Sequence, residues 1–209
     1  MANGDRLVWV DLEMTGLDPA SDEIVEIAAI VTDAELNELD EGISLVIKCN
    51  DAPLAAMDEV VVNMHTESGL INEIAHGISL ESAQEQVLEY IRKHVPEPRK
   101  APLAGSSVYV DRGFINAYMP DLDDYLHYRL VDVSSIKELV RRWYPRTYFA
   151  LPEKTGNHRA LGDIRESIAE LRYYREAVFV AQPGPDSTIA KELGLRHVVD
   201  HGSVEARDS

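Results

Sequence analysis

Three short apolar runs near the start of the chain, each followed by a polar turn, predict three β-strands. They cover Arg6–Glu13, Glu23–Asp33 and Gly42–Lys48. The turns between them, Gly16–Asp22 and Asn37–Glu41, contain the glycine, proline, asparagine and aspartate residues that turns favour. Consecutive strands joined by short turns are typical of an antiparallel meander, so we expect these strands to pair in order.

Beyond residue 50 the apolar positions follow the period of a helix, with two further short strands among them. Ser79 suits the N-cap of a long helix that ends before Pro96, and Ser135 with Glu138 forms a capping box that predicts another helix start. We expect an irregular loop over Arg146–Asn157. The predicted helices are 53–58, 63–72, 80–95, 112–119, 136–143, 159–180 and 187–193, and the further predicted strands are 103–108 and 128–133.

The order of these elements predicts the fold class and the domain boundaries. Strands that come first, followed by helices interleaved with further strands, predict an α/β fold with a five-stranded mixed sheet flanked by helices. A chain of 209 residues suits one domain with a tail. The composition changes after Gln182-Pro183-Gly184-Pro185, so we expect the domain to cover residues 1–180 and a C-terminal tail to cover residues 181–209.

Composition narrows the cellular setting and the kind of partner. The formal net charge of −17 argues against broad binding to long nucleic acid, which requires a basic surface, but not against a short polyanion held at a metal-filled cleft. Cys49 is the only cysteine, which rules out an intramolecular disulfide and fits a reducing compartment. We find no apolar run of about 20 residues and no apolar signal region before the first strand, so we expect a cytoplasmic protein without membrane association.

Two acids, Asp11 and Glu13, stand one residue apart at the end of the first predicted strand. Side chains alternate between the faces of a strand, so both carboxylates point the same way, roughly 6–7 Å apart along the strand. Neighbouring carboxylates repel each other, and a divalent cation between them removes that cost. The start of a solvated loop explains the pair equally well, because acids are mostly surface residues.

Further candidate residues lie downstream. Asp111 opens a predicted helix, where capping or the helix dipole explains an acid better than metal binding does. His158 and Asp163 lie at the start of the last long helix, where solvated side chains are common, but Gly162 costs a helix about 1 kcal/mol and indicates close approach of another backbone or a ligand. Together, four carboxylates and one histidine suit a two-metal phosphoryl-transfer centre with a histidine base.

Seven segments, in order along the chain, resemble the oligoribonuclease family, the histidine variant of the DEDD 3′–5′ exonucleases. The match runs from Leu7 to about Val180 and leaves the tail outside. The segments are Val-Asp-Leu-Glu-Met-Thr-Gly-Leu-Asp, Ile-Val-Glu-Ile-Ala, His-Thr-Glu-Ser-Gly-Leu, Asp-Arg-Gly-Phe, His-Tyr-Arg, Asp-Val-Ser-Ser-Ile-Lys-Glu-Leu and His-Arg-Ala-Leu-Gly-Asp-Ile-Arg-Glu-Ser.

This resemblance implies a ribonuclease H-like fold, a homodimer and two divalent cations, Mg²⁺ or Mn²⁺. It implies that Asp11, Glu13, Asp111 and Asp163 hold the metals and that His158 is the general base. The implied substrates are very short RNAs, especially dinucleotides and including the linear diguanylate left from cyclic di-GMP breakdown. The implied products are 5′-mononucleotides.

The resemblance also implies a set of substrate contacts. Leu17 is expected to wedge against a base. Ser107, with the partner subunit's Tyr128 and the partner subunit's Arg129, is expected to cap the 5′ phosphate, and His65 to help on the same side. Without the family, Arg129 is better explained as the surface end of a strand.

One position departs from the family pattern. Members carry a base-stacking tryptophan soon after Met-Asp-Asp, whereas Met57-Asp58-Glu59 is followed here by Val60, which has no aromatic face. Two other interpretations of the acids stay open. They could form a structural cation site in a binding module, or the active site of a DNA proofreading subunit with the same fold.

Overall fold

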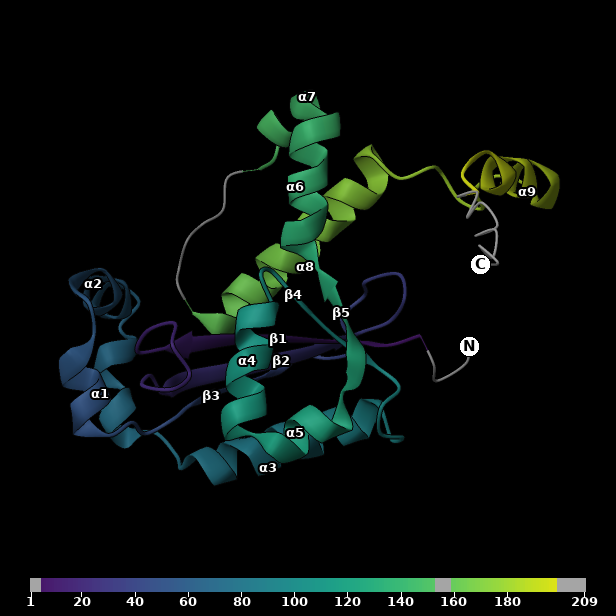
Figure 1. The fold of residues 1–209 in the computed structure, drawn as a ribbon. Coiled ribbons are helices and arrows are strands. Elements are labelled where there is room, and N and C mark those ends of the chain that lie inside the picture. Colours follow the sequence, from purple (N-terminus) through teal and green to yellow (C-terminus); the bar gives the residue numbers. More distant parts are fainter. Residues whose placement is uncertain (1–4, 153–158, 199–209) are drawn as a thin grey trace, which may run out of the picture. The chain divides into compact units, whose positions relative to one another are not determined.

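The computed structural model describes residues 5–152 and 159–198, and the chain divides into two compact units, Met1–Val178 and Phe179–Ser209. The first unit contains one five-stranded sheet in the order β3-β2-β1-β4-β5 (Figure 1). Strands β3, β2 and β1 pair antiparallel as the expected meander, and β1, β4 and β5 pair parallel, so the expected mixed sheet is confirmed. The strands are β1 (Leu7–Met14), β2 (Ile24–Thr32), β3 (Ile43–Val46), β4 (Pro102–Gly105) and β5 (His127–Asp132).

Helices cover both faces of the sheet in the first unit. Figure 1 shows α3 and α5 on one side of the strands and α8 on the other. The first group contains α3 (Leu80–His94), α4 (Tyr109–Tyr118) and the short α5 (Pro120–Tyr125), and the second contains α6 (Val133–Trp143) and α8 (Ala160–Ala177). Short elements fill the connections: α1 (Asp51–Ala56), α2 (Glu59–Glu67), η1 (Leu70–Asn72), η2 (Ile74–His76) and α7 (Pro145–Phe149).

The alternation of side chains along β1 divides the core in two. Val8, Val10 and Leu12 are buried in the cluster that packs against α3, α4 and α5. Trp9 points the other way, into the cluster formed with α6 and α8, and its indole N–H donates a hydrogen bond to Thr32 Oγ1 at 3.0 Å. Residues 11 and 13 share the parity of Trp9, so the end of β1 presents its acids on the α8 side.

The second unit contains α9 (Ser187–Arg196), slightly longer than the predicted 187–193. Its N-cap is Asp186, whose carboxylate accepts hydrogen bonds from the N–H groups of Thr188 and Ile189. Among the described residues of the whole chain, no helix is long and apolar enough to cross a membrane.

Several predicted boundaries were wrong. The strand expected over Leu103–Val108 stops at Gly105, because Ser107 takes a positive φ of 54° and turns its N–H to Asp132 Oδ1 at 2.8 Å. The short helix α5 was not predicted. The loop expected over Arg146–Asn157 includes most of α7, while its residues 153–157 lie outside the described part of the chain.

The predicted capping box was also wrong. Helix α6 begins at Val133, and its N-cap is Asp132, whose carboxylate accepts the Ser134 N–H at 3.0 Å. Ser135 is already inside the helix, and its hydroxyl donates to the same carboxylate at 2.8 Å. Asp132 takes the capping position because its carboxylate accepts two backbone N–H groups, that of Ser107 after β4 and that of Ser134 in the first turn of α6.

Asp132→Ala is expected to lower the free energy of unfolding by about 1–2 kcal/mol, the usual size of a lost N-cap. Ser135→Ala is the matched control and is expected to cost less, because its hydroxyl donates a single hydrogen bond to that carboxylate. Urea denaturation followed by circular dichroism measures both values. A larger loss for Ser135→Ala would contradict the assignment of the cap to Asp132.

Candidate active site

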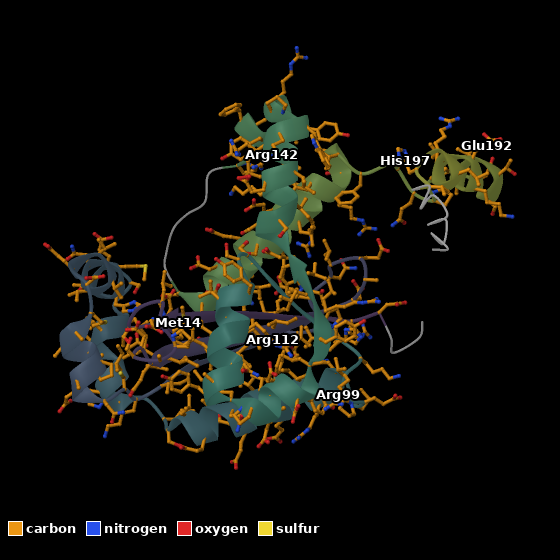
Figure 2. All side chains as sticks on the ribbon, in the orientation of Figure 1. Met14, Arg99, Arg112, Arg142, Glu192 and His197 are labelled. Atoms are coloured by element: carbon orange, nitrogen blue, oxygen red, sulfur yellow. The ribbon has the colours of Figure 1, made fainter. Side chains whose placement is uncertain are left out.

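Three of the predicted metal ligands come together at the end of β1. Asp11 and Glu13 project from the strand, and Asp163 lies in the first turn of α8. One carboxylate oxygen from each residue lies within 4.8 Å of the other two. Figure 2 marks this end of the strand with Met14, the last residue of β1. The packing of Trp9 against α8 thus brings the acids of the strand to the acid of the helix.

The fourth predicted ligand, Asp111, is buried beside these three. It lies in the first turn of α4, and its Oδ1 accepts the N–H of Leu12 at 3.0 Å. The expectation was a helix cap or a favourable interaction with the helix dipole. The cap was wrong, because the N-cap of α4 is Val108 and the Asp111 carboxylate turns to the strand, whereas the place of Asp111 in the first turn fits the dipole. Its charge raises the pKa of Asp11, which places it in the same electrostatic cluster.

Burial and mutual repulsion make this cluster unusually hard to ionise. Burial, followed by repulsion from Asp111, raises the pKa of Asp11 well above its ordinary value of 3.8. Burial, followed by repulsion from Asp163, raises the pKa of Glu13 from 4.5 to about 8, and burial raises the pKa of Asp111 from 3.8 to about 7. A divalent cation offsets this repulsion, and a donor set made only of carboxylate oxygens fits a hard cation such as Mg²⁺ or Mn²⁺.

Two charged residues beside the acids were missed by sequence reasoning. Glu26 lies directly opposite Glu13 in the β1–β2 register and is fully buried. Arg159, the N-cap residue of α8, holds Glu26 through its guanidinium, and its charge lowers the pKa of Glu13 against the other effects. The available signal was an acid in the middle of a strand that is otherwise apolar.

Gly162 was expected to mark a close approach of another backbone. A Cβ added at Gly162 would meet no heavy atom within 4 Å among the described residues, so the backbone part of that expectation was wrong. His158, the predicted base, lies outside the described residues.

His65 is fully buried against the acids rather than exposed on the surface. Its Nε2 lies 2.9 Å from the Met14 carbonyl oxygen, which can only accept, so Nε2 carries the proton. Its Nδ1 lies 3.8 Å from Glu13 Oε2 and has no hydrogen-bond partner among the described residues. His65 is therefore fixed to the end of β1 through its Nε2 and lies beside Glu13 without a hydrogen bond to it.

The other predicted substrate contacts lie at the surface. Leu17 is 75% exposed in the turn that follows β1. A Cβ at Gly16 would come within 2.5 Å of the Asp22 carboxylate, which accepts the Thr15 hydroxyl and the Asp18 N–H, so a larger residue there would disturb these bonds of the turn. Val60, at the position where the family carries tryptophan, is exposed on α2.

The residues predicted to cap a 5′ phosphate lie at opposite ends of the parallel β4–β5 pair in one chain: Ser107 follows β4 beside Asp132, whereas Tyr128 and Arg129 lie at the start of β5. Ser107 donates its hydroxyl to Ser134 Oγ at 3.0 Å. Tyr128 is 75% exposed on β5, and the Arg129 guanidinium lies 5.5 Å from the centre of the Tyr128 ring. Strand β5 is the edge of the sheet, which leaves this pair open to contact from outside the chain.

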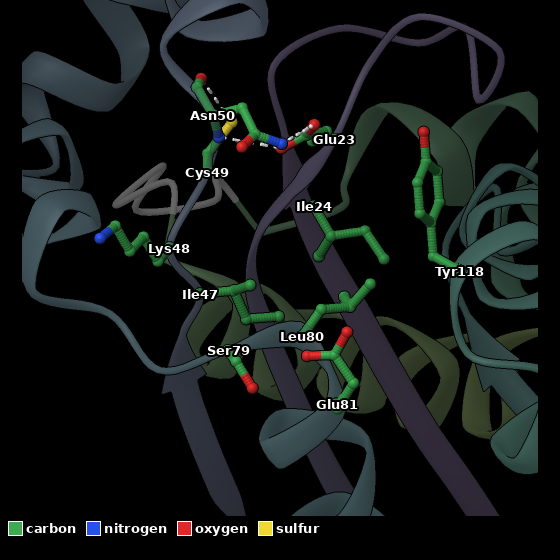
Figure 3. Close-up of a pocket in the computed structure, with 10 residues that line it drawn as sticks. All are labelled: Glu23, Ile24, Ile47, Lys48, Cys49, Asn50, Ser79, Leu80, Glu81 and Tyr118. Atoms are coloured by element: carbon green, nitrogen blue, oxygen red, sulfur yellow. Dashed lines mark hydrogen bonds between the residues drawn. The ribbon is translucent and has the colours of Figure 1, made fainter.

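A separate half-open pocket of about 400 Å³ lies beside the start of β2 (Figure 3). Its wall includes Glu23, which accepts two hydrogen bonds from Asn50, and Tyr118 stands across from them. None of the predicted catalytic, metal or substrate residues lines it. The acids that can bind a cation therefore do not lie in this pocket.

Comparison with known proteins now places the chain. The RNase_T exonuclease family model matches residues 8–171. The oligoribonuclease of Streptomyces avermitilis is 62% identical over 195 residues, which cover 93% of this chain and 98% of that protein. The chain belongs to the oligoribonuclease family. The oligoribonuclease of Streptomyces griseus is 64% identical over 192 residues, which cover 92% of this chain and 96% of that protein. The oligoribonuclease of Mycobacterium avium is 60% identical over 185 residues, which cover 88% of this chain and 86% of that protein.

Solved structures confirm the fold expected for this family. The zinc-bound complex of Escherichia coli exonuclease I with single-stranded DNA superposes with a TM-score of 0.63 at 16% identity. The match covers 83% of this chain and 41% of that one, and it shows the fold alone. The fold is α/β and ribonuclease H-like. As a member of the oligoribonuclease family, the protein is a metal-dependent exonuclease.

The raised pKa values predict that the metal-free protein loses stability as the pH rises. The folded-state pKa values of Glu13 and Asp111, about 8 and about 7, exceed the ordinary values of 4.5 and 3.8. The folded state therefore holds protons that the unfolded state has already released. The resulting stability is full below about pH 4 and is lost by about pH 8.

Thermal unfolding in EDTA measures this loss, with Glu13→Gln as the comparison because it removes one titrating group at nearly constant volume. The difference in unfolding temperature, parent minus Glu13→Gln, is expected to become smaller or more negative as the pH rises from 4 to 8. Added Mn²⁺ is expected to raise the parent more than the variant. Parallel pH curves in EDTA would contradict the raised pKa of Glu13.

Proposed function

We propose that the protein is a 3′–5′ exoribonuclease that degrades very short RNA to 5′-mononucleotides, with dinucleotides, including linear diguanylate, as preferred substrates. The observation that carries the proposal is the carboxylate cluster of Asp11, Glu13 and Asp163 in a chain 62% identical to an oligoribonuclease. The net charge of −17 also supports a short substrate, because a strongly acidic surface repels the phosphates of a long nucleic acid.

In this proposal, Asp11, Glu13 and Asp163 hold one cation, and Asp11 and Asp111 hold a second. When bound, the two cations, Mg²⁺ or Mn²⁺, supply Lewis acidity at the scissile phosphate and activate water for attack. The general base is His158, which takes the proton of the attacking water at neutral pH.

The substrate contacts are proposed at both ends of a dinucleotide. Exposed Leu17 offers an apolar wedge for a base next to the acids. Ser107 binds the 5′ phosphate together with the partner subunit's Tyr128 and the partner subunit's Arg129. A guanidinium recognises a terminal phosphate through paired hydrogen bonds and blocks a longer 5′ extension at the same place.

A homodimer is part of this proposal, because it brings a second copy of β5 to the site. In one chain, aromatic side chains on β5, at the end of α6 and on α7 are open to solvent, and a second subunit packed on any of them would cover apolar surface. They are Tyr128, Trp143, Tyr144 and Phe149. The single Cys49 thiol supports a reducing compartment, and we propose the cytoplasm.

A direct comparison of substrates tests the activity. With Mn²⁺, the protein is expected to release mononucleotides from a 5′-phosphorylated diribonucleotide much faster than from long single-stranded DNA. Asp11→Asn is expected to abolish release, because it removes a carboxylate shared by both proposed cations. Product release is followed by chromatography. Faster cleavage of the long DNA would favour a DNA exonuclease, and no cleavage of either with Mn²⁺ would leave a structural cation site.

The 5′ phosphate cap is tested by Arg129→Ala. Loss of a charged hydrogen-bonding partner costs roughly 1.5–3 kcal/mol, so kcat/KM for the diribonucleotide is expected to fall by about 10- to 100-fold, with a smaller effect on longer RNA. Arg92→Ala is a matched control, because Arg92 also stacks on a tyrosine, at 5.2 Å from the ring centre of Tyr125, and lies on α3. Equal activity of Arg129→Ala and the parent on both RNAs would contradict the cap.

A further inference from the structure

Arg159 is held between two glutamates from distant parts of the chain. Its Nε and Nη2 contact the Glu26 carboxylate at 3.1–3.2 Å, and its Nη1 and Nη2 contact the Glu73 carboxylate at 3.0 and 3.1 Å. Glu26 lies on β2, and Glu73 lies between η1 and η2. We call Arg159, Glu26 and Glu73 the Arg159 clamp.

The inner glutamate of the clamp is fully committed to protein partners. Besides Arg159, Glu26 accepts the Ser44 hydroxyl at 2.7 Å and the Ala160 N–H at 3.4 Å. It is fully buried, and a buried carboxylate without a positive partner is strongly destabilising. Glu26 is therefore satisfied by the guanidinium and two further donors, although it lies next to the metal-binding acids.

The backbone of the same arginine starts the helix that carries Asp163. The Arg159 carbonyl oxygen accepts the N–H groups of Gly162 at 2.9 Å and Asp163 at 3.1 Å. Glu26 in turn lies opposite Glu13 across the β1–β2 ladder. One residue thus joins the helix that presents Asp163 to the pair of strands that presents Asp11 and Glu13.

We infer that Arg159 is a positioning residue that sets the placement of Asp163 relative to Asp11 and Glu13, and through it the affinity of the site for a divalent cation. The inference rests on the metal site proposed above. A guanidinium suits this task because its planar fork fixes the direction of two carboxylates at once, which a lysine ammonium does not do.

The same helix offers a matched control for the clamp. Arg165 of α8 also reaches across to the β2–β3 connection, where its Nε contacts Glu38 at 3.2 Å and its Nη2 donates to the Glu41 carbonyl oxygen at 2.9 Å. Neither partner belongs to the acid cluster. Loss of Arg165 thus removes a comparable tie between helix and sheet without touching the placement of Asp163.

The test is calorimetric titration of the full chain with Mn²⁺, together with thermal unfolding. Arg159→Gln is expected to weaken Mn²⁺ binding by about 10- to 100-fold, the usual effect of losing an outer partner of a metal site, with the number of sites unchanged. Arg159→Lys is expected to lie between the parent and Arg159→Gln. Arg165→Gln is expected to lower the unfolding temperature but to bind Mn²⁺ like the parent.

Three outcomes would overturn the inference. The first is parent-like Mn²⁺ affinity in Arg159→Gln. The second is an equal loss of affinity in Arg165→Gln, because the effect would then be one of general stability. The third is a lost Mn²⁺ site in Glu26→Gln together with parent-like binding in Arg159→Lys, because Glu26 would then be a ligand itself. If Arg159→Gln does not fold, Arg159→Lys and Glu73→Gln decide the question. Both variants keep a positively charged partner beside Glu26, and each is expected to weaken Mn²⁺ binding.

Asp11→Asn separates this inference from the proposed function. If the parent does not bind Mn²⁺, or if Asp11→Asn binds it equally well, the proposed metal site is wrong and the role of Arg159 falls with it. If Asp11→Asn loses binding while Arg159→Gln and Arg159→Lys keep it, the metal site stands and only the inference about Arg159 fails.

Discussion

Repulsion among buried carboxylates is the constraint on which the site depends. Asp11, Glu13 and Asp163 meet within 4.8 Å, Asp111 lies beside them, and Glu26 faces them from the next strand. Burial and mutual repulsion raise the pKa values of Asp11 and Glu13, because the charged form of each acid is opposed by its neighbours. The surrounding core holds the acids together, so a cation finds a site that is already assembled instead of having to gather its ligands.

The fold provides this rigidity by using one strand for two purposes. One face of β1 is apolar along its length and packs into the core under α3, α4 and α5. The other face changes from Trp9, packed against α8, to the acids one step further on. The Asp111 carboxylate then receives the Leu12 N–H, so α4 is fixed to the same strand. Core packing and ligand placement are therefore consequences of the same alternation.

Local patterns were sufficient for part of this picture. The alternation of a strand predicts that Asp11 and Glu13 share a face, and the apolar runs predict the meander. The residue types alone suggested that Asp163 joins these acids, and the family resemblance implied a shared metal site. Local sequence alone favoured a helix-end role for Asp111, because its partner, Leu12, lies 99 residues away. Its role as a metal ligand, which the resemblance implied, stays a prediction. Arg159 and Glu26 are separated by 133 residues, and nothing local to either predicts their pairing. The place of His158 stays a prediction.

The parity of β1 has a consequence for how this chain can vary. Inserting or deleting one residue between Trp9 and Asp11 would exchange the two faces of everything that follows in the strand. The acids would turn into the apolar cluster under α4, and Leu12 would turn toward Asp163. Such a change would disrupt the packing of the core and the placement of the acids together, so the length of this short segment is constrained more tightly than any one of its side chains.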